Sequence, residues 1–182
     1  MGTLILVCGP ARSGKSEWAE QLALNSGLAV TYVATAAENP DDAEWTARLE
    51  RHRQRRPATW QTVCAPRQLT EAISTHDVAD RCLLVDSLGT WVSNWLAVDE
   101  AAWQAVTAPW LSQLQTPCGT LILVAEEVGA GVVPAYELGR LFRDRLGYLI
   151  RQIGAFAKPV YWVTGGHALD LSRLGQPLPG QG

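Results

Sequence analysis

The residues with the clearest chemical potential form the pattern GxxxxGKS, which directly follows a short apolar run. In such a loop, backbone N–H groups surround phosphate oxygens, the lysine reaches the terminal phosphates and the serine hydroxyl holds Mg²⁺. A helix beginning at the end of the loop adds its positive dipole end to the same anion site. We therefore predict a nucleoside triphosphate site, with Lys15 catalytic and Ser16 a magnesium ligand, formed by Gly9, Pro10, Ala11, Arg12, Ser13, Gly14, Lys15 and Ser16.

Two acidic side chains end apolar runs further along the chain. Asp86 follows Leu83-Leu84-Val85, the position where a Walker B acid completes the Mg²⁺ shell in proteins with such a loop. We predict that Asp86 binds magnesium, and a solvated acid at a strand end is the alternative. Glu127 ends the next apolar run. It is a candidate for a substrate hydroxyl, a base edge or a metal-linked water.

A basic segment around one histidine, RLERHRQRRP, runs from Arg48 to Pro57 and holds five arginines within nine residues. On a helix, Arg48 and Arg56 lie four residues either side of His52 and share its face. Neighbouring cations disfavour the imidazolium form, so we expect His52 to be neutral and nucleophilic. A neutral imidazole among guanidinium groups is suited to attack a phosphorus atom whose oxygens the arginines hold. A solvated basic helix is the alternative.

Apolar runs and helical patterns supply the elements that must position these side chains. The runs are short and continuous, which is typical of strands covered on both faces, and they span Leu4–Val7, Val30–Thr35, Cys82–Asp86, Thr120–Ala125 and Val160–Thr164. We predict helices between them at Lys15–Asn25, Ala43–Arg56, Arg67–Thr75, Thr90–Leu96, Ala102–Gln115 and Tyr136–Ala157. This alternation predicts an α/β fold with a mostly parallel sheet flanked by helices. Ligands bind such sheets at the carboxyl ends of the strands.

Composition limits the class of protein. A chain of 182 residues predicts a single domain, over residues 1–174, with a disordered tail over 175–182. The net charge of −3 argues against a general nucleic-acid binder. No run approaches the ~18 apolar residues of a membrane span, and the first run is too short for a signal peptide. Four cysteines without CxxC spacing predict buried free thiols in a reducing, cytoplasmic setting.

Several segments in this order resemble a known family. They are GPARSGKS, Tyr32-Val33-Ala34-Thr35-Ala36, Arg48-Leu49…His52…Arg56-Pro57…Trp60, Val85-Asp86-Ser87-Leu88…Ser93-Asn94, Glu127-Val128-Gly129-Ala130-Gly131-Val132-Val133-Pro134 and Phe142-Arg143-Asp144-x-x-Gly147. Together they are similar to the bifunctional adenosylcobinamide kinase/adenosylcobinamide-phosphate guanylyltransferase family of cobalamin biosynthesis. The resemblance extends from Leu4 to about Gly166.

The resemblance implies a RecA-like P-loop fold and a homotrimer. It also implies two reactions: phosphorylation of the corrinoid's aminopropanol hydroxyl by ATP or GTP, then GMP transfer from GTP to the new phosphate through a GMP–histidine intermediate. By position, His52 would be the guanylylated residue and Asp86 would complete the GTP site. The remaining GTP-site residues would be Ala34, Thr35, Ala36, Arg53, Gln54, Arg55 and Arg56.

The chain departs from the family pattern at several positions. Cys64 stands where many members have Glu, Ser87 where Cys is common, and Glu126 where Asn is usual. Ile150-Arg151 and the segment from Gly165 to Asp170 also differ, which leaves open whether both activities are retained. Two other readings are a plain P-loop small-molecule kinase, which forms no covalent adduct, and a nucleotide-dependent switch or assembly module.

Overall fold

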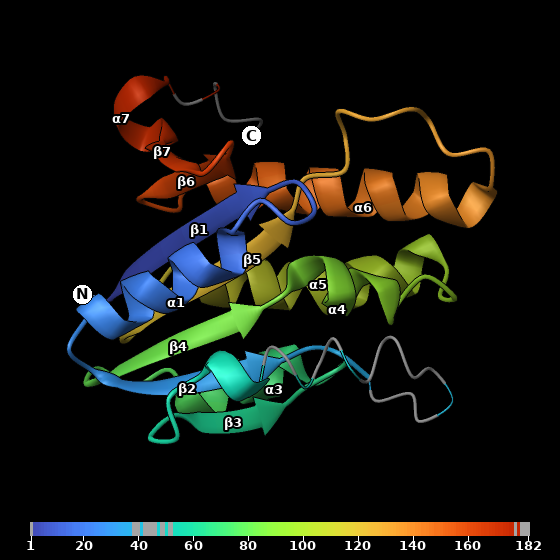
Figure 1. The fold of residues 1–182 in the computed structure, drawn as a ribbon. Helices are drawn as coiled ribbons and strands as arrows, with labels where there is room; N and C mark the ends of the chain where they lie inside the picture. Colours follow the sequence, from blue (N-terminus) through green and yellow to red (C-terminus); the bar gives the residue numbers. More distant parts are fainter. Residues whose placement is uncertain are drawn as a thin grey trace.

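The computed structural model describes residues 2–37, 41, 47, 50, 53–176 and 178. Within this part of the chain, one seven-stranded sheet has the order β3-β2-β4-β5-β1-β6-β7 (Figure 1). All neighbouring strands are parallel except β6 and β7, which form an antiparallel hairpin. The strands are β1 (Thr3–Gly9), β2 (Ala29–Ala34), β3 (Gln61–Cys64), β4 (Arg81–Asp86), β5 (Thr120–Glu126), β6 (Val160–Thr164) and β7 (His167–Asp170).

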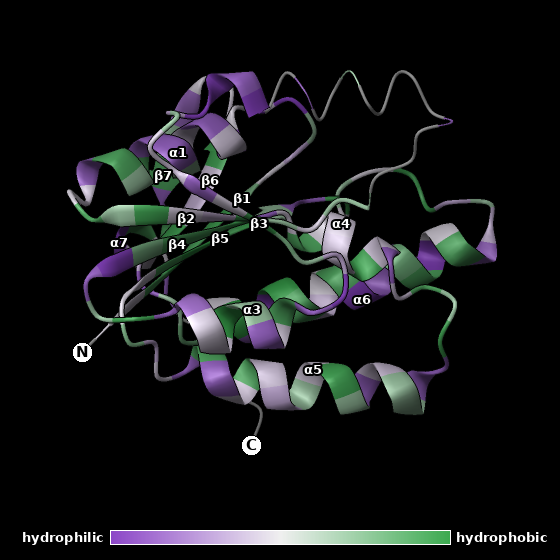
Figure 2. Ribbon diagram, turned by 90° about the horizontal axis from the view of Figure 1, so that it is seen from below, coloured by the Kyte–Doolittle hydropathy of each residue, from purple (hydrophilic) through white to green (hydrophobic). Residues whose placement is uncertain are grey.

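Helices cover both faces of this sheet, as the view along the layers shows (Figure 2). The described helices are α1 (Lys15–Asn25), α3 (Leu69–His76), α4 (Leu88–Ser93), α5 (Glu100–Leu114), α6 (Glu137–Gly154) and α7 (Leu171–Leu174). On one face, Ala19 and Ala23 of α1 pack against the strands. On the other, α3, α4, α5 and α6 bury their apolar sides in a larger cluster. The predicted mostly parallel sheet with flanking helices is confirmed.

The larger cluster is centred on tryptophan side chains. Trp91 of α4 and Trp110 of α5 are fully buried, and their ring centroids lie 4.9 Å apart. Trp103 adds a third ring, 5.6 Å from Trp91. Because aromatic side chains bury large apolar areas, these contacts join two helices into one layer. That layer packs against the sheet, and the polar residues of the candidate site follow the carboxyl ends of its strands.

The five predicted strands are all present, with ends that differ by one or two residues, and α1 has its predicted bounds. Sequence patterns missed β3 and β7. Both are short, and each pairs with only one other strand at an edge of the sheet. An edge strand needs no continuous apolar run, and β3 is exposed at three of its four positions. The helix predicted at Ala43–Arg56 lies mostly outside the described residues, which are helical at 47, 50 and 53–55.

The four cysteines are free thiols but differ in burial. Cys8 and Cys82 are buried on central strands, whereas Cys64 and Cys118 are exposed. The prediction of buried thiols is therefore wrong for two of them, because Cys64 lies on the edge strand β3 and Cys118 precedes β5. Among the described residues, no helix is long and apolar enough to cross a membrane.

Candidate nucleotide-binding and transferase site

The loop between β1 and α1 has the backbone shape of an anion-binding loop. Gly14 adopts a φ of 90°, and Arg12 adopts a φ of 59°, so two residues within three positions occupy the left-handed region. A Cβ added at Gly9 would lie 2.5 Å from the Val163 carbonyl oxygen and 2.6 Å from Ser13 Oγ. Because the Val163 backbone and the Ser13 side chain approach so closely, this position requires glycine.

Two polar side chains of the loop are buried with few partners. Lys15 is 7% exposed, and its ammonium donates one long hydrogen bond, 3.4 Å, to the Pro10 carbonyl oxygen. The Ser13 hydroxyl is buried and has no hydrogen-bond partner. Buried polar groups are normally satisfied, so this arrangement is suited to an anionic ligand that supplies the missing contacts.

A pocket of about 410 Å³ opens beside this loop. Its walls come from the carboxyl ends of β2, β3, β4 and β5, from the start of α1 and from α4 and α6. The lining residues are Lys15, Ser16, Tyr32, Ala34, Ala36, Ala37, Arg53, Arg56, Thr62, Cys64, Asp86, Ser87, Gly89, Thr90, Ser93, Asn94, Glu126 and Phe142. This is the position at which open parallel sheets bind ligands.

Asp86 is held at the end of β4 by an aromatic neighbour. The Tyr32 hydroxyl donates a hydrogen bond to Asp86 Oδ2 at 3.1 Å, and the Arg56 guanidinium lies 3.9 Å from the centroid of the Tyr32 ring. Burial, and then the charge of Asp86, raise the pKa of Tyr32 well above its usual value. The phenol therefore stays protonated and keeps donating to the carboxylate.

The oxygen atoms of this pocket suit a magnesium ion bound together with a nucleotide. Ser16 and Asp86 line the same pocket and offer a hydroxyl and a carboxylate. No group of three or more histidine, cysteine or acidic side chains that could hold a metal occurs among the described residues. Mg²⁺ commonly takes one or two protein oxygens plus substrate phosphates and water, so these two residues fit the ion only alongside a triphosphate.

A second carboxylate, Glu126, organises the corner between β4 and α4. It accepts hydrogen bonds from Ser87 Oγ at 2.6 Å and from the Gly89 N–H at 2.9 Å. Thr35 Oγ1 accepts from the Ser87 N–H at 2.9 Å and donates to the Ser87 carbonyl oxygen at 2.7 Å. Asn94 Nδ2 donates to the Thr35 carbonyl oxygen at 2.9 Å. These bonds hold the strand end that carries Asp86.

The structure brings many, but not all, of the predicted residues to the pocket. Lining it are Lys15, Ser16, Ala34, Ala36, Arg53, Arg56 and Asp86. Thr35 is buried and hydrogen-bonds to Ser87, which lines the pocket.

Other predicted residues do not line the pocket. Gln54 Nε2 donates to Glu50 Oε1 at 3.0 Å, and Arg55 binds carboxylates of α1. Glu127 is not among the lining residues, and its Oε1 accepts from the Gly129 N–H at 2.7 Å. His52 lies outside the described residues.

Sequence reasoning assigned no role to several residues that line the pocket. Tyr32, Thr62, Asn94 and Phe142 are examples. Tyr32 lies two residues before the end of an apolar strand, so its hydroxyl gave no signal of a partner 54 positions away. Glu126 stands directly beside the predicted Glu127. Only the turn of the chain after β5 decides which of the two acids faces the pocket.

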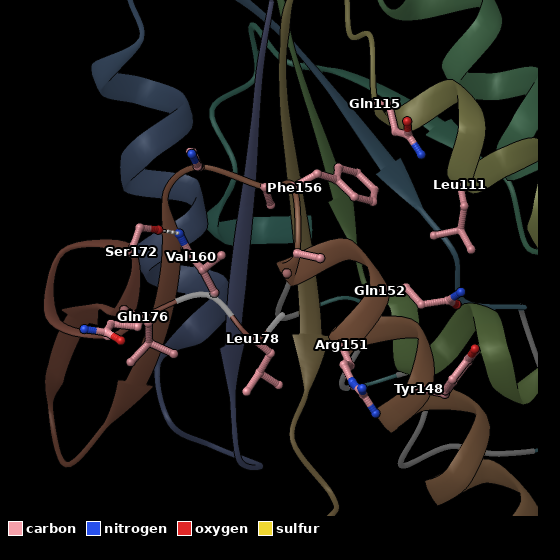
Figure 3. Close-up of a pocket in the computed structure, with 16 residues that line it drawn as sticks. Leu111, Gln115, Tyr148, Arg151, Gln152, Phe156, Val160, Ser172, Gln176 and Leu178 are labelled. Carbon is pink, nitrogen blue, oxygen red and sulfur yellow. Dashed lines mark hydrogen bonds between the residues drawn. The ribbon is translucent and has the colours of Figure 1, made fainter. Parts of the chain in front are cut away.

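A larger hollow of about 660 Å³ lies elsewhere, between the C-terminal end of α6, α5 and α7 (Figure 3). Leu111, Phe156 and Leu178 give it a largely apolar lining. None of the residues of the P-loop or of the strand ends discussed above lines it. We therefore assign the chemistry to the smaller pocket, where cations, acids and hydroxyls converge.

Comparison with known proteins gives consistent matches along the chain. The family profile described as "Cobinamide kinase / cobinamide phosphate guanyltransferase" matches residues 5–171. The "Bifunctional adenosylcobalamin biosynthesis protein CobP" of Pseudomonas aeruginosa is 41% identical over 174 residues, covering 95% of this chain and 98% of that protein. The "Bifunctional adenosylcobalamin biosynthesis protein CobU" of Escherichia coli is 36% identical over 177 residues, covering 90% and 96%.

Solved structures with a similar fold are ATPase-related. An ATP synthase subunit, NeqB, from Nanoarcheaum equitans has a TM-score of 0.52 at 13% identity. A type III secretion ATPase from pathogenic bacteria has a TM-score of 0.53 at 12% identity. Each match covers 96% of this chain and 53% of the other chain. At such low identity the likeness concerns the fold alone, and it confirms the predicted P-loop architecture.

Proposed function

The chain belongs to the cobinamide kinase / cobinamide phosphate guanyltransferase family, and from this premise we propose that it carries out two successive transfers. In the first, ATP or GTP phosphorylates a hydroxyl of adenosylcobinamide. In the second, GMP passes from GTP to the new phosphate, which yields adenosylcobinamide-GDP and pyrophosphate. The observation that carries this proposal is that Lys15, Ser16, Asp86, Arg53 and Arg56 all line one pocket.

The kinase step depends on charge stabilisation by the P-loop. In the transition state, negative charge spreads over the oxygens of the transferring γ-phosphoryl group. Lys15 is already buried and held by one long hydrogen bond, and it forms no ion pair with another described residue. We propose that its ammonium and the loop N–H groups bind these oxygens. Ser16 and Asp86 would hold Mg²⁺, which supplies further charge neutralisation when bound.

The guanylyl transfer step uses His52 as nucleophile. An imidazole nitrogen attacks the α-phosphorus of GTP, a nitrogen–phosphorus bond forms, and the bond to the bridging oxygen breaks so that pyrophosphate leaves. A phosphate oxygen of the corrinoid then attacks the same phosphorus and displaces the imidazole. Two displacements replace one difficult transfer, which is the advantage of covalent catalysis. Support comes from sequence adjacency, because His52 directly precedes Arg53, and Arg53 lines the pocket.

The test uses GTP labelled at the α-phosphate, mixed with the protein and Mg²⁺. We expect acid-labile label on the protein and a mass increase equal to one GMP. His52→Ala should form no adduct but should retain phosphorylation of adenosylcobinamide. His167→Ala is the matched control, because His167 is exposed on β7 and is not among the residues that line the pocket. An adduct on the His52→Ala variant would contradict the assignment of the nucleophile.

Lys15→Ala extends this test to the part of the site that both steps share. Removal of one preorganised charge-stabilising donor costs about 10²–10³ in kcat, so we expect both activities to fall by at least about 10². The chain has one other lysine, Lys158, which lines the larger hollow instead. Lys158→Ala should therefore leave both rates unchanged. Loss of one activity alone in Lys15→Ala would contradict a shared nucleotide site.

We also propose that the protein acts as a homotrimer, as its resemblance to the family implies. Support comes from the loop at 127–136 and the start of α6, which carry exposed apolar side chains. Val132 is 95% exposed and Tyr136 is 83% exposed. Large exposed apolar patches on soluble proteins often mark interaction surfaces.

A further inference from the structure

Arg55 points away from the nucleotide pocket and toward α1. Its Nη1 contacts Glu17 Oε1 at 2.5 Å, and its Nη2 contacts Glu20 Oε1 at 3.2 Å. Glu17 and Glu20 lie in the first two turns of α1, the helix that begins at Lys15 of the P-loop. One guanidinium thus joins two carboxylates, 38 and 35 positions away in sequence, into a cluster that we call the Arg55 clasp.

The arginines on either side of the clasp line the pocket. Arg53 and Arg56 are both among its lining residues, and Arg55 is not. Arg56 lies over the Tyr32 ring and donates a hydrogen bond to Thr62 Oγ1 at 3.3 Å. The short segment 53–56 is therefore attached to α1 on one side and to the strands β2 and β3 on the other. Both attachments fix cations beside the P-loop.

The clasp also matters for the acids that it contacts. The side chain of Glu20 is only 12% exposed. Burial raises the pKa of Glu20, and the positive charge of Arg55 opposes that rise. A largely buried carboxylate close to the site of a triphosphate would repel the ligand if it had no cation beside it. Arg55 therefore balances the charge of α1 while it holds its own segment in place.

We propose that Arg55 is a positioning residue that holds Arg53 and Arg56 at the nucleotide pocket by binding Glu17 and Glu20 of the P-loop helix. This inference rests on the proposed function, because it assumes that GTP occupies this pocket. Arg55 acts through its neighbours and touches no reacting atom. Its partners are acids, and without their charge Arg55 would no longer hold Arg53 and Arg56 in place. The removal of negative charge from α1 should therefore weaken the binding of a negatively charged nucleotide.

That consequence separates positioning from simple electrostatics. The experiment measures the GTP dissociation constant by titration calorimetry with Mg²⁺ for Arg55→Ala, for Glu17→Gln/Glu20→Gln and for the combined triple variant. If the clasp positions the arginines, each of the first two variants binds GTP about fivefold more weakly, the size expected of a partly exposed ion-pair network. The triple variant should be no weaker than either, because all three changes remove one interaction.

Other outcomes overturn the proposal. If Arg55 contacted GTP directly, or acted only by its charge, the glutamine pair would bind GTP as tightly as the wild type or more tightly. Full additivity in the triple variant would also contradict a shared clasp. Arg55→Lys, which can keep one of the two ion pairs, should show an intermediate loss. Gln21→Ala is the matched control on α1, since the exposed Gln21 side chain donates its hydrogen bond to Asn25 of the same helix.

A check of folding keeps the test decisive. Thermal unfolding checks that each variant is folded, and if Glu20→Gln fails to fold, Glu17→Gln alone takes its place, because Glu17 is 59% exposed. GTP affinity tests the clasp independently of the covalent step. A wild-type protein that binds GTP but forms no adduct would overturn the histidine mechanism and leave the clasp standing. Unchanged affinity in every variant would overturn the clasp and leave the mechanism standing.

Discussion

At the residue scale, Cys64 and Cys118 can report whether the pocket is occupied, because both are exposed free thiols. Cys64 lines the nucleotide pocket. Cys118 precedes β5 and donates its N–H to Asp77 Oδ2 at 2.8 Å, at the amino end of the strands. The other two thiols are buried, and burial raises the pKa of Cys8 to about 12 and that of Cys82 to about 11. At pH 8 both therefore stay in the unreactive protonated form.

We predict that GTP with Mg²⁺ protects Cys64, but not Cys118, from alkylation by iodoacetamide at pH 8. At a GTP concentration of about ten times its dissociation constant, Cys64 should react about tenfold more slowly, because only the unoccupied fraction reacts. Peptide mass spectrometry measures both sites in the same sample. Equal rates at Cys64 with and without GTP would contradict the assignment of this pocket.

At the scale of elements, the approach of β5 to α4 depends on one small residue. A Cβ added at Gly89 would lie 2.1 Å from Glu126 Oε2 and 2.8 Å from Glu126 Cδ. The carboxylate is fixed there by its bonds to Ser87 and Gly89, so it has little freedom to withdraw. The missing side chain at Gly89 thus lets an acid from one strand reach the first turn of a neighbouring helix.

A matched pair of glycine substitutions tests this contact. Gly89→Ala should lower the free energy of unfolding by about 1–3 kcal/mol, the usual cost of overpacking. Gly147→Ala in α6 should raise it by about 0.5–1 kcal/mol, because the added methyl group meets nothing within 4 Å and alanine favours helix interiors. Urea denaturation measures both. A Gly89→Ala variant with an unchanged or higher free energy of unfolding would contradict the close approach at Gly89.

The helices and strands differ in how well local sequence patterns predict them. Strands β1, β4 and β5 lie inside the sheet with helices on both faces, so their residues form continuous apolar runs that can be recognised. The edge strands β3 and β7 have no such requirement, and sequence patterns missed both. Helix α1 was predicted with its observed bounds because the glycine of the P-loop marks its start. Its partner Arg55 could not be inferred, since that contact joins residues 38 positions apart.

At the scale of the whole molecule, the loop 127–136 extends along α6 beyond the end of β5 (Figure 1). Arginines of α6 hold its backbone. Arg143 Nη2 donates to the Gly129 carbonyl oxygen at 2.5 Å, and Arg140 Nη1 donates to the Ala135 carbonyl oxygen at 2.7 Å. A loop that is anchored in this way presents Val132 and Val133 to solvent, at 95% and 61% exposure. Both side chains are exposed where the proposed trimer could bury them.

We predict that light scattering gives a solution mass three times the 19.8 kDa of the chain. Val132→Asp combined with Val133→Asp should shift the protein toward smaller species, because a charge buried in an interface costs free energy. Leu174→Asp is the control, since Leu174 is 71% exposed on α7 and lies outside that loop. A monomeric wild type would contradict the proposed trimer, and an unchanged mass in the double variant would exclude this loop from the interface.

The sequence by itself determined the features that depend on neighbouring residues. These are the P-loop between a buried strand and a helix, the acid at the end of β4, and the alternation that predicts a parallel sheet. Only the tertiary structure decided which side chains meet: Glu126 at Gly89, Tyr32 at Asp86, and Arg55 at Glu17 and Glu20. The physical reason is the distance along the sequence between the residues that make contact. A local pattern records burial and backbone preference, whereas these contacts join residues more than 30 positions apart, and only the packing of the sheet and its helices brings them within bonding distance.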